Sequence, residues 1–292
     1  MKKILFYFAL LLLVVSCNKD EITNKSKINF SFITTDNNIK KVMNINPETT
    51  DQNSWSISCY ELASSAFDPT TSSLGYADCN GFYKLIDPVT GVVTNEFILP
   101  ASISQTVIDP NENCLIGQFF YVDSNQIIKI SLETGETVAM NAIHFNSAIS
   151  TCSYFYHQRL KRYMLITDDN VLHYINPDNG LITQNVTLES VVSNGVFDEQ
   201  NNRIIGLKYS ANDQKLYIET LNASTGVLIS REEVSETFDY YACESDYDKE
   251  SNAFILVSSD NNIKFINVES GDVIESYQIN YPVSEFHFWR NE

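Results

Sequence analysis

The feature that most constrains the fold is a short segment with a turn glycine that occurs five times. The copies read "KLIDPVTGVVTNEF", "KISLETGETVAMN", "YINPDNGLITQNV", "ETLNASTGVLISR" and "FINVESGDVIESY". Their glycines, at positions 91, 135, 180, 226 and 271, are separated by 44, 45, 46 and 45 residues. So regular a period indicates a repeat architecture, in which each repeat buries its apolar face against the next one.

Each copy predicts a β-hairpin. Apolar residues on both sides of the turn alternate with polar ones and are rich in β-branched and aromatic types, which is typical of strands. The [Asn/Asp/Glu]-x-[Ser/Thr/Asn]-Gly core suits a four-residue hairpin loop in which the Asx-like residue accepts backbone N–H groups and glycine takes a positive φ. No Gly-rich P-loop or GxGxxG pattern surrounds it, so a structural role is favoured over phosphate binding.

A second hairpin precedes each copy. In it, an apolar residue followed by Asp ends one strand, and a polar loop leads to the next strand. The residues at this position are Asp68, Asp109, Asp198 and Asp248, with His157 as the exception. Four strands in about 45 residues, without an amphipathic helix, are typical of one β-propeller blade.

The two ends of the chain predict the number of blades. Residues 28–50 align with 253–271, except that Thr50 replaces the glycine and the first strand is missing. The tail "PVSEFHFW", Pro282 to Trp289, has the pattern of a lone innermost strand. We therefore expect an all-β, six-bladed β-propeller over residues 27–292, with four-stranded antiparallel blades and a ring closed by the C-terminal strand joining the N-terminal blade. Closure would leave no sheet edge open at this point of the ring.

These alternating apolar-Asp and Asp/Asn-x-x-Thr-Gly hairpins resemble the broad superfamily of YVTN, YncE-like and quinoprotein-like propellers. The resemblance covers about residues 27–292 and is architectural. Neither the Trp-docking motif of quinoprotein propellers nor WD, GH, YWTD, sialidase Asp-box or "YVTN" signatures occur in the sequence. The resemblance therefore implies a fold, and it assigns no activity to individual residues.

The first 16 residues predict an export signal. Lys2 and Lys3 are followed by the apolar run Ile4 to Val15 and by Ser16-Cys17. The run is shorter than the roughly 18 to 20 residues that span a bilayer. "VVSC" resembles the lipobox of bacterial lipoproteins, which implies that Cys17 is acylated and becomes the new N-terminus. A plain secretory signal with an incidental cysteine is the alternative.

The residues after Cys17 bear on localisation. Asn18 stands where, in bacterial lipoproteins, Asp favours retention in the inner membrane, so the resemblance implies sorting to the outer membrane. Lys19-Asp20-Glu21 resembles a surface-export signal of some Gram-negative bacteria. Residues 17–26 are then a lipidated polar tether, in which Asn18 to Ser26 reach at most about 30 Å at roughly 3.4 Å per residue.

The charge of the chain narrows the choice of partners. Nineteen Lys and Arg against 37 Asp and Glu give a formal net charge of −18. Such a surface repels nucleic-acid phosphates, so we expect no nucleic-acid function. The acidity also favours solubility, independently of any recognition.

Candidate binding residues lie in the loops that enter the innermost strands, because propellers bind ligands on the face that these loops form. The polar and aromatic residues expected there are Tyr60, Gln105, Asn194, Tyr241, Glu244 and Glu285. Aromatic rings at such a place suit sugars or a protein partner. They also suit a purely structural role in covering the seams between blades.

Two metal hypotheses follow from acidic residues of the same face. Glu61, Glu244 and Glu285 would converge at the channel mouth and could act as acid and base or hold a divalent cation. Asp and Asn in the loops between second and third strands suit calcium, but they are also the residues that tight turns require. We favour the turn role, and we expect no cofactor unless the three glutamates bind a cation.

Cysteines and histidines show no catalytic or metal-binding spacing. The four histidines are scattered, and no HExxH or GxSxG motif occurs. Five cysteines remain after Cys17, which predicts small buried side chains and room for one disulfide.

Taken together, the sequence predicts a lipid-anchored, surface-exposed propeller that acts as a non-catalytic binding module of an outer-membrane assembly. Its expected partner is an outer-membrane protein or a glycan, with the membrane contacted through Cys17. The alternative is a metal-assisted hydrolase or lyase that uses Glu61, Glu244 and Glu285.

Overall fold

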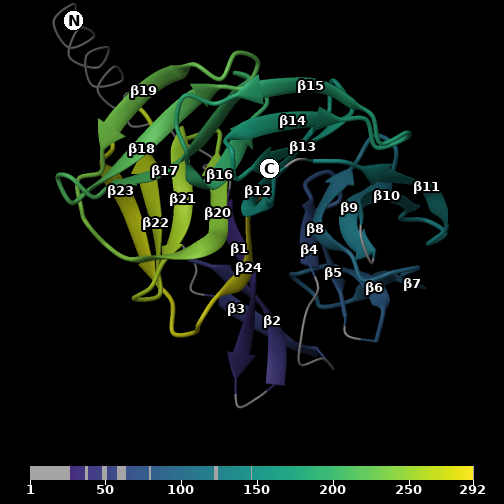
Figure 1. Cartoon of the computed structure of the whole chain (residues 1–292). Helices are drawn as coiled ribbons and strands as arrows, with labels where there is room; N and C mark the ends of the chain where they lie inside the picture. Colours follow the sequence, from purple (N-terminus) through teal and green to yellow (C-terminus); the bar gives the residue numbers. More distant parts are fainter. Residues whose placement is uncertain are drawn as a thin grey trace, which may run out of the picture.

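The computed structural model describes residues 27–36, 39–47, 51–57, 64–78, 80–121, 124–145 and 147–291. These residues form six four-stranded antiparallel sheets arranged as the blades of a β-propeller (Figure 1). In the described part of the chain, no helix is long and apolar enough to cross a membrane. The predicted signal sequence, Cys17 and the predicted tether lie outside the described residues.

Blades 1 to 3 follow one another along the chain. Their strands are β4 (Ser64–Asp68), β5 (Ser73–Ala77), β6 (Phe82–Ile86) and β7 (Val93–Ile98); β8 (Ser104–Asp109), β9 (Cys114–Tyr121), β10 (Ser124–Ser131) and β11 (Thr137–Ile143); and β12 (Ile149–His157), β13 (Arg162–Thr167), β14 (Val171–Ile175) and β15 (Ile182–Thr187). Blades 4 and 5 are β16 (Ser193–Asp198), β17 (Arg203–Ser210), β18 (Lys215–Asn222) and β19 (Leu228–Glu233), then β20 (Tyr240–Asp248), β21 (Ala253–Ser258), β22 (Asn262–Asn267) and β23 (Val273–Gln278).

Blade 6 combines the two ends of the described chain. Its strand order is β24-β1-β2-β3, where β24 is Ser284–Asn291, β1 is Lys27–Asp36, β2 is Ile39–Asn46 and β3 is Asp51–Ile57. β24 pairs with β1 from Lys27↔Asn291 to Ile33↔Ser284. The prediction of six blades closed by the C-terminal strand is confirmed.

The hydrophobic core is a ring of six clusters, and each cluster lies between two neighbouring blades. Between blades 2 and 3, for example, Ile116 and Ile127 pack with Tyr163 and Leu165. Because each inner strand is covered by a blade on both sides, β21 is buried along its whole length. The outer strand β7, by contrast, is mostly exposed.

The repeated glycine turns have the predicted geometry. All five glycines have φ between 70° and 75°. In blade 1 the N–H of Gly91 donates to the carbonyl oxygen of Asp87 (2.7 Å), and the Asp87 carboxylate accepts the N–H of Val89 (2.8 Å). In blade 2, Ser131 replaces the Asx residue, and its hydroxyl accepts the N–H of Glu133 (3.3 Å).

The propeller has two distinct faces. The turn face is formed by the β-turns between first and second strands and by the residues just before the glycine turns, which are joined by bonds such as Leu132 N–H to Asn113 O (2.9 Å). The turn glycines themselves lie against the end of the outer strand of the preceding blade, where Gly226 O accepts the N–H of Glu189 (2.9 Å). The mouth face is formed by the loops entering the innermost strands and the loops between second and third strands, joined for example by Leu188 N–H to Asn170 O (2.8 Å).

The Asp residues of the loops between second and third strands bond within their own turns. Asp78 accepts the N–H of Asn80 (2.9 Å), Thr167 donates to Asp169 (2.6 Å), and Ser258 donates to Asp260 (2.5 Å). These contacts are those expected of turn-forming residues.

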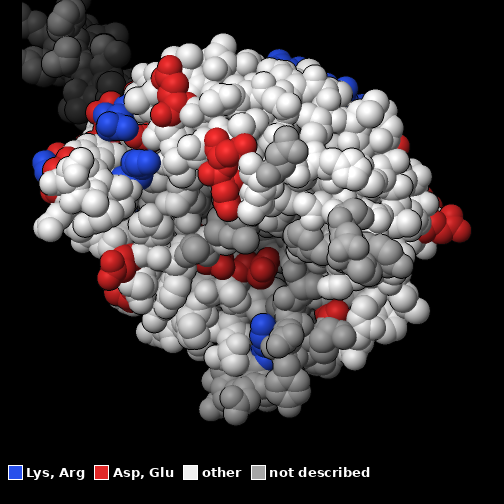
Figure 2. Space-filling model, viewed as in Figure 1, with Lys and Arg blue, Asp and Glu red and all other residues white. Residues whose placement is uncertain are grey.

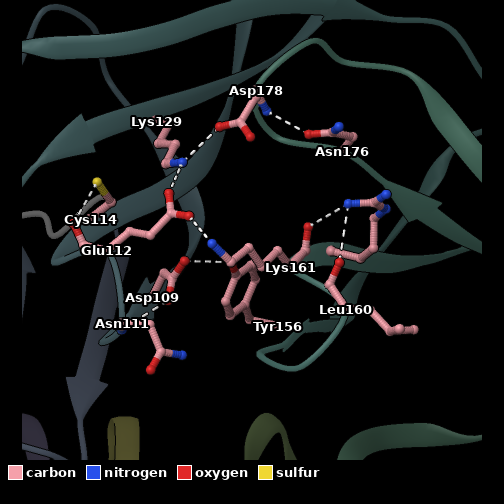
Figure 3. A network of polar contacts seen from close by, with 11 residues as sticks. Asp109, Asn111, Glu112, Cys114, Lys129, Tyr156, Leu160, Lys161, Asn176 and Asp178 are labelled. Carbon is pink, nitrogen blue, oxygen red and sulfur yellow. Dashed lines mark hydrogen bonds and ion pairs between the residues drawn. The ribbon is translucent and has the colours of Figure 1, made fainter.

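A polar network on the turn face joins blades 2 and 3 (Figure 3). The ammonium group of Lys129 pairs with Glu112 of its own blade and with Asp178 of blade 3 (2.7 Å), and Lys161 of blade 3 pairs with Glu112. Hydrogen bonds from Lys129 and Lys161 lower the pKa of Glu112 to about 2. Because Lys129 is only 4% exposed, these carboxylates compensate its burial.

Candidate functional site

The candidate residues are organised by one repeated position, which we call the inner ring. It lies four residues before the Asp, His or Trp near the end of each innermost strand, and it comprises Ser64, Gln105, Ser153, Asn194, Glu244 and Glu285. Four of the residues predicted for binding therefore occupy equivalent places in four blades. Tyr60 and Glu61 lie outside the described residues, and their predicted roles stay predictions.

A β-bulge marks the inner ring in blades 2 to 6, whereas Ser64 of blade 1 pairs with Ala77 in regular register. The register shifts between Ser104 and Val107 in blade 2, and between Ser193 and Val196 in blade 4. Gln105, Asn194 and Glu285 have φ of 52°, 51° and 55°, a region that costs a side-chain-bearing residue about 1 kcal/mol or more. A bulge re-aims the side chains next to it, so the ring residues leave the regular alternation of the strand.

Four side chains of the inner ring bond to the innermost strand of the next blade. Glu244 of blade 5 accepts the N–H groups of Glu285 (3.0 Å) and Phe286 (2.8 Å) in blade 6. Glu285 in turn accepts the N–H (3.0 Å) and the hydroxyl (2.7 Å) of Ser65 in blade 1. The carboxylates thus satisfy N–H groups that no neighbouring strand pairs.

Two neutral members of the ring, Ser64 and Asn194, repeat this arrangement, whereas the Gln105 side chain accepts a hydrogen bond from Gln118 of its own blade (2.7 Å). The Ser64 hydroxyl accepts the N–H of Thr106 in blade 2 (3.1 Å). Asn194 of blade 4 accepts the N–H of Cys243 (3.2 Å) and donates to the carbonyl oxygen of Tyr241 (2.7 Å). Tyr241 is thereby held at the entry of β20.

Acidic residues line the whole seam between β20 and β24. After Glu244, Asp246 accepts the N–H of Phe288 (2.9 Å), and Asp248 accepts the guanidinium of Arg290 (2.9 Å). These alternate residues of β20 point to the same side of the strand. These three carboxylates hold β24, the strand that closes the propeller, against β20.

Burial shapes the electrostatics of the ring. Burial and the charge of Glu285 raise the pKa of Glu244 to about 7, and burial raises that of Asp246 to about 6. Burial and the charges of Glu285 and Glu244 raise the pKa of the Tyr154 hydroxyl in blade 3. The Tyr154 hydroxyl of blade 3 therefore lies in the electrostatic field of carboxylates from blades 5 and 6.

A buried Ser–His contact, which the sequence did not reveal, lies beside Glu285. The Ser65 hydroxyl is 2.7 Å from Nε2 of His287 and donates to Glu285. Burial lowers the pKa of His287 to about 4, so its imidazole group is neutral at pH 7. Ser65 is 1% exposed, which makes this group a buried relay of hydrogen bonds rather than an accessible nucleophile.

Cys243 of the same region is disulfide-bonded, whereas Cys114 is a free, buried thiol. The sequence allowed for one disulfide, and Cys243 takes part in one. Among the described residues, no group of three or more His, Cys, Asp or Glu could hold a metal ion. Because Glu61 is not described, the hypothesis of a cation held by three glutamates stays a prediction.

Two depressions lie on the described surface. One of about 340 Å³ on the turn face is lined by Asn111, Gln158, Arg159, Glu199 and Gln200. Another of about 150 Å³ on the mouth face lies between β13–β14 and the loop 188–192. Figure 2 shows acidic side chains at the edge of the displayed face and in a hollow near its middle. The smaller depression lies below the roughly 300–1,000 Å³ of typical ligand pockets, and the larger one lies at the lower end of that range.

Comparison with known proteins defines the fold. No protein-family model and no curated protein matches the sequence. Among solved structures, the β-propeller domain of Myceliophteria thermophila Cps50 (Swd1) is similar, with a TM-score of 0.56 and 11% identity over 86% of this chain and 87% of that one. The dihydro-heme d1 dehydrogenase NirN, in complex with DHE, has a TM-score of 0.53 and 11% identity over 84% of this chain and 53% of its own.

Proposed function

We propose that this protein is a lipid-anchored β-propeller of the YVTN/YncE-like kind that acts as a binding module in an outer-membrane assembly. Export is supported by the signal pattern and by the disulfide at Cys243, since disulfides persist in oxidising compartments. Cys17 supplies the anchor, and the mouth face supplies the contact with an outer-membrane protein or a glycan. The net charge of −18 disfavours nucleic acid as a partner.

The observation that carries the proposal is the way the inner ring uses its polar groups. Both carboxylate oxygens of Glu244 accept backbone N–H groups of the next blade. A group engaged in this way holds blades together and makes the mouth face rigid. Rigid surfaces bind partners with little loss of conformational entropy, which is an advantage for a binding module.

The test is photo-cross-linking on intact cells. A photoreactive amino acid replaces Tyr241 at the mouth face, and the matched control replaces Ile229 on the outer strand β19, which is 56% exposed. We expect one reproducible partner from position 241 and none from position 229. Equal capture from both positions would count against a specific mouth-face contact.

A second function is favoured by one observation. Glu244 has a pKa of about 7 and lies beside Glu285, and a general acid or base works best near the ambient pH. A hydrolase or lyase would use these residues with Glu61 and a divalent cation. Its turnover would fall at least a hundredfold in Glu244→Gln with the fold intact, whereas a binding module has no turnover to lose.

A further inference from the structure

Cys243 takes part in a disulfide on the mouth side of the inner ring. It directly precedes Glu244, the inner-ring residue of blade 5, and it is exposed, whereas Glu244 is only 8% exposed. The backbone of Cys243 is held by Asn194 of blade 4, whose amide oxygen accepts the N–H of Cys243 (3.2 Å). Because β20 enters the propeller at the mouth face, Cys243 lies between that face and Glu244.

The number of cysteines limits the choice of partner for Cys243. The chain contains six cysteines, and Cys114 is a free, buried thiol. The partner is therefore Cys17, Cys59, Cys79 or Cys152. Acylation of Cys17, as the lipobox predicts, would occupy its sulfur and leave no thiol for a disulfide.

Cys152 occupies in β12 the same position that Cys243 occupies in β20. It directly precedes Ser153, the inner-ring residue of blade 3, just as Cys243 precedes Glu244. The β-bulges of both strands include this position. The two cysteines therefore stand at equivalent places in innermost strands that are separated by one blade.

The strands β12 and β20 approach each other although they belong to blades 3 and 5. Their Cα atoms come within 8 Å, and both strands lie near the centre of the propeller (Figure 1). Burial and the charges of Glu285 and Glu244 raise the pKa of Tyr154, which follows Cys152 by two residues, so the strands are close at the level of the two cysteines. Disulfides join Cα atoms about 4.4–6.8 Å apart, a separation that strands in such contact can provide.

The other cysteines do not share this position. Cys79 stands in the sequence between β5 and β6, the second and third strands of blade 1, and the innermost strand β4 lies between them and the channel. Blade 6 also separates blade 1 from blade 5. Cys59 lies outside the described residues, and it precedes Ser64, the inner-ring residue of blade 1, by five positions rather than one.

We propose that Cys243 is bonded to Cys152, so that a disulfide ties the innermost strands of blades 3 and 5 together on the mouth side of the inner ring. The bond joins residues 91 positions apart. It reinforces the hydrogen bonds that Asn194, in the blade between them, makes to Tyr241 and Cys243. Because Cys243 is exposed, a reductant can release this tie in the folded protein.

Reduction by a dithiol follows ordinary thiol–disulfide exchange. One thiolate of the reductant attacks a cysteine sulfur and displaces the other cysteine, and its second thiolate then displaces the first cysteine. Two electrons pass to the protein, both cysteines become thiols by taking up a proton each, and the reductant becomes a cyclic disulfide. The apolar clusters between neighbouring blades do not depend on the bond, so we expect the mouth to loosen while the blades stay folded.

Peptide mapping of the unreduced wild-type protein identifies the pair directly. Cleavage by trypsin after Lys and Arg places Cys152 in peptide 130–159, Cys243 in peptide 232–249, and Cys59 together with Cys79 in peptide 42–84. After free thiols are blocked, we expect mass spectrometry to find peptide 130–159 bonded to peptide 232–249, and dithiothreitol should separate them. A bond from peptide 232–249 to peptide 42–84, or to the peptide that contains Cys17, would overturn the proposal.

Thiol labelling of variants tests the same pairing by a second route. In Cys152→Ser, Cys243 should be left as an exposed thiol, so peptide 232–249 should react with a maleimide in the folded protein. In Cys59→Ser and Cys79→Ser this peptide should stay unlabelled. Cys114→Ser is the matched control, because it removes a buried free thiol and should also leave the peptide unlabelled. Labelling in Cys59→Ser but not in Cys152→Ser would contradict the pairing.

Carboxyl labelling tests whether the bond holds the mouth. A water-soluble carbodiimide couples an amine to accessible carboxylic acids, and Glu244 is almost buried in the intact protein. We expect Glu244 to be labelled roughly threefold faster or more in Cys152→Ser, because local opening no longer has to break the disulfide. The side chain of Glu250 is 59% exposed and should be labelled at the same rate in both proteins. Unchanged labelling of Glu244 would refute the role given to the bond.

Discussion

Glu244 and Glu285 are 41 residues apart and occupy the same position in neighbouring blades, and the carboxylate of the first accepts the backbone N–H of the second at 3.0 Å. Each carboxylate is bound by main-chain groups of the following blade, so the pair lies in a chain of contacts that continues into blade 1. The same two residues therefore determine how the ring closes and how its centre is charged.

Replacement of Glu244 by Gln should change how stability depends on pH. The pKa of Glu244 is raised from 4.5 to about 7 in the folded protein, so the folded state binds more protons than the unfolded state between these values. The free energy of unfolding therefore falls by about 3 kcal/mol as the pH rises through this window. Glu244→Gln removes this contribution.

We expect Glu244→Gln to match the wild type within about 1 kcal/mol at pH 5 and to be more stable by about 2 kcal/mol at pH 8, because Gln remains uncharged but offers one acceptor oxygen fewer. Urea unfolding at both pH values measures the difference. The same difference at pH 5 and pH 8 would contradict the role given to the buried charge. Asp246, which is raised to about 6, retains a slope of the same sign in both proteins.

The two acidic partners of Arg290 should differ in their contribution to stability. The Asp248 side chain is 2% exposed and that of Glu250 is 59% exposed. Asp248→Asn leaves the guanidinium in the seam without its buried partner and should cost about 3 kcal/mol. Glu250→Gln removes an exposed contact and should cost less than about 0.5 kcal/mol. Chemical denaturation of both variants measures the loss in the free energy of unfolding. Equal losses in the two variants would show that β24 is not held by the buried pair of Arg290 and Asp248.

Two glycines separate backbone strain from close packing. Gly81 has φ of 82° with no atom within 4 Å of an added Cβ, whereas at Gly226, with φ of 75°, the Cβ would lie 2.0 Å from the carbonyl oxygen of Thr187. Gly81→Ala should therefore cost about 1–2 kcal/mol from the positive φ alone. Gly226→Ala should cost about 3 kcal/mol or more, because the outer strand β15 of blade 3 must also move. Thermal unfolding that gave equal losses would place the whole cost in the backbone angle.

The disulfide at Cys243 should stabilise the folded protein. Reduction should lower the free energy of unfolding by about 2–4 kcal/mol. Cys243→Ser should show the loss without reductant and little further change when reductant is added. Denaturation with and without dithiothreitol tests this, and a variant as sensitive to reductant as the wild type would contradict it.

Most of the fold could be predicted from the sequence, because the repeated residues are those that a particular backbone conformation requires. The turns require a positive φ and therefore a glycine, and the spacing of the five turn glycines shows the length of the repeat. The closure by the C-terminal strand was predictable because residues 28–50 lack one strand and the tail offers one. The order of loops also brought Gln105, Asn194, Glu244 and Glu285 to one ring.

The contacts within the ring could not be predicted. The bulge determines which N–H groups face the next blade. In blade 2 the pairing register shifts between Ser104 and Val107, and no residue type at positions 104 to 107 predicts this shift. The Ser65–His287 contact joins residues 222 positions apart, and neither residue belongs to a recognisable motif. Asp246 and Tyr154 were missed for the same reason, since burial rather than sequence pattern sets their pKa values.

The pairing of β24 with β1 also sets the order of events during synthesis. β1 is made before the other strands and β24 is made after them, so one edge of β1 stays unpaired while blades 1 to 5 are translated. An unpaired edge can pair with other chains, and partly folded chains expose it for longest. A chain stopped before Ser284 therefore exposes this edge permanently, and completion of the last eight strand residues decides whether the product is a closed ring or a substrate for quality control.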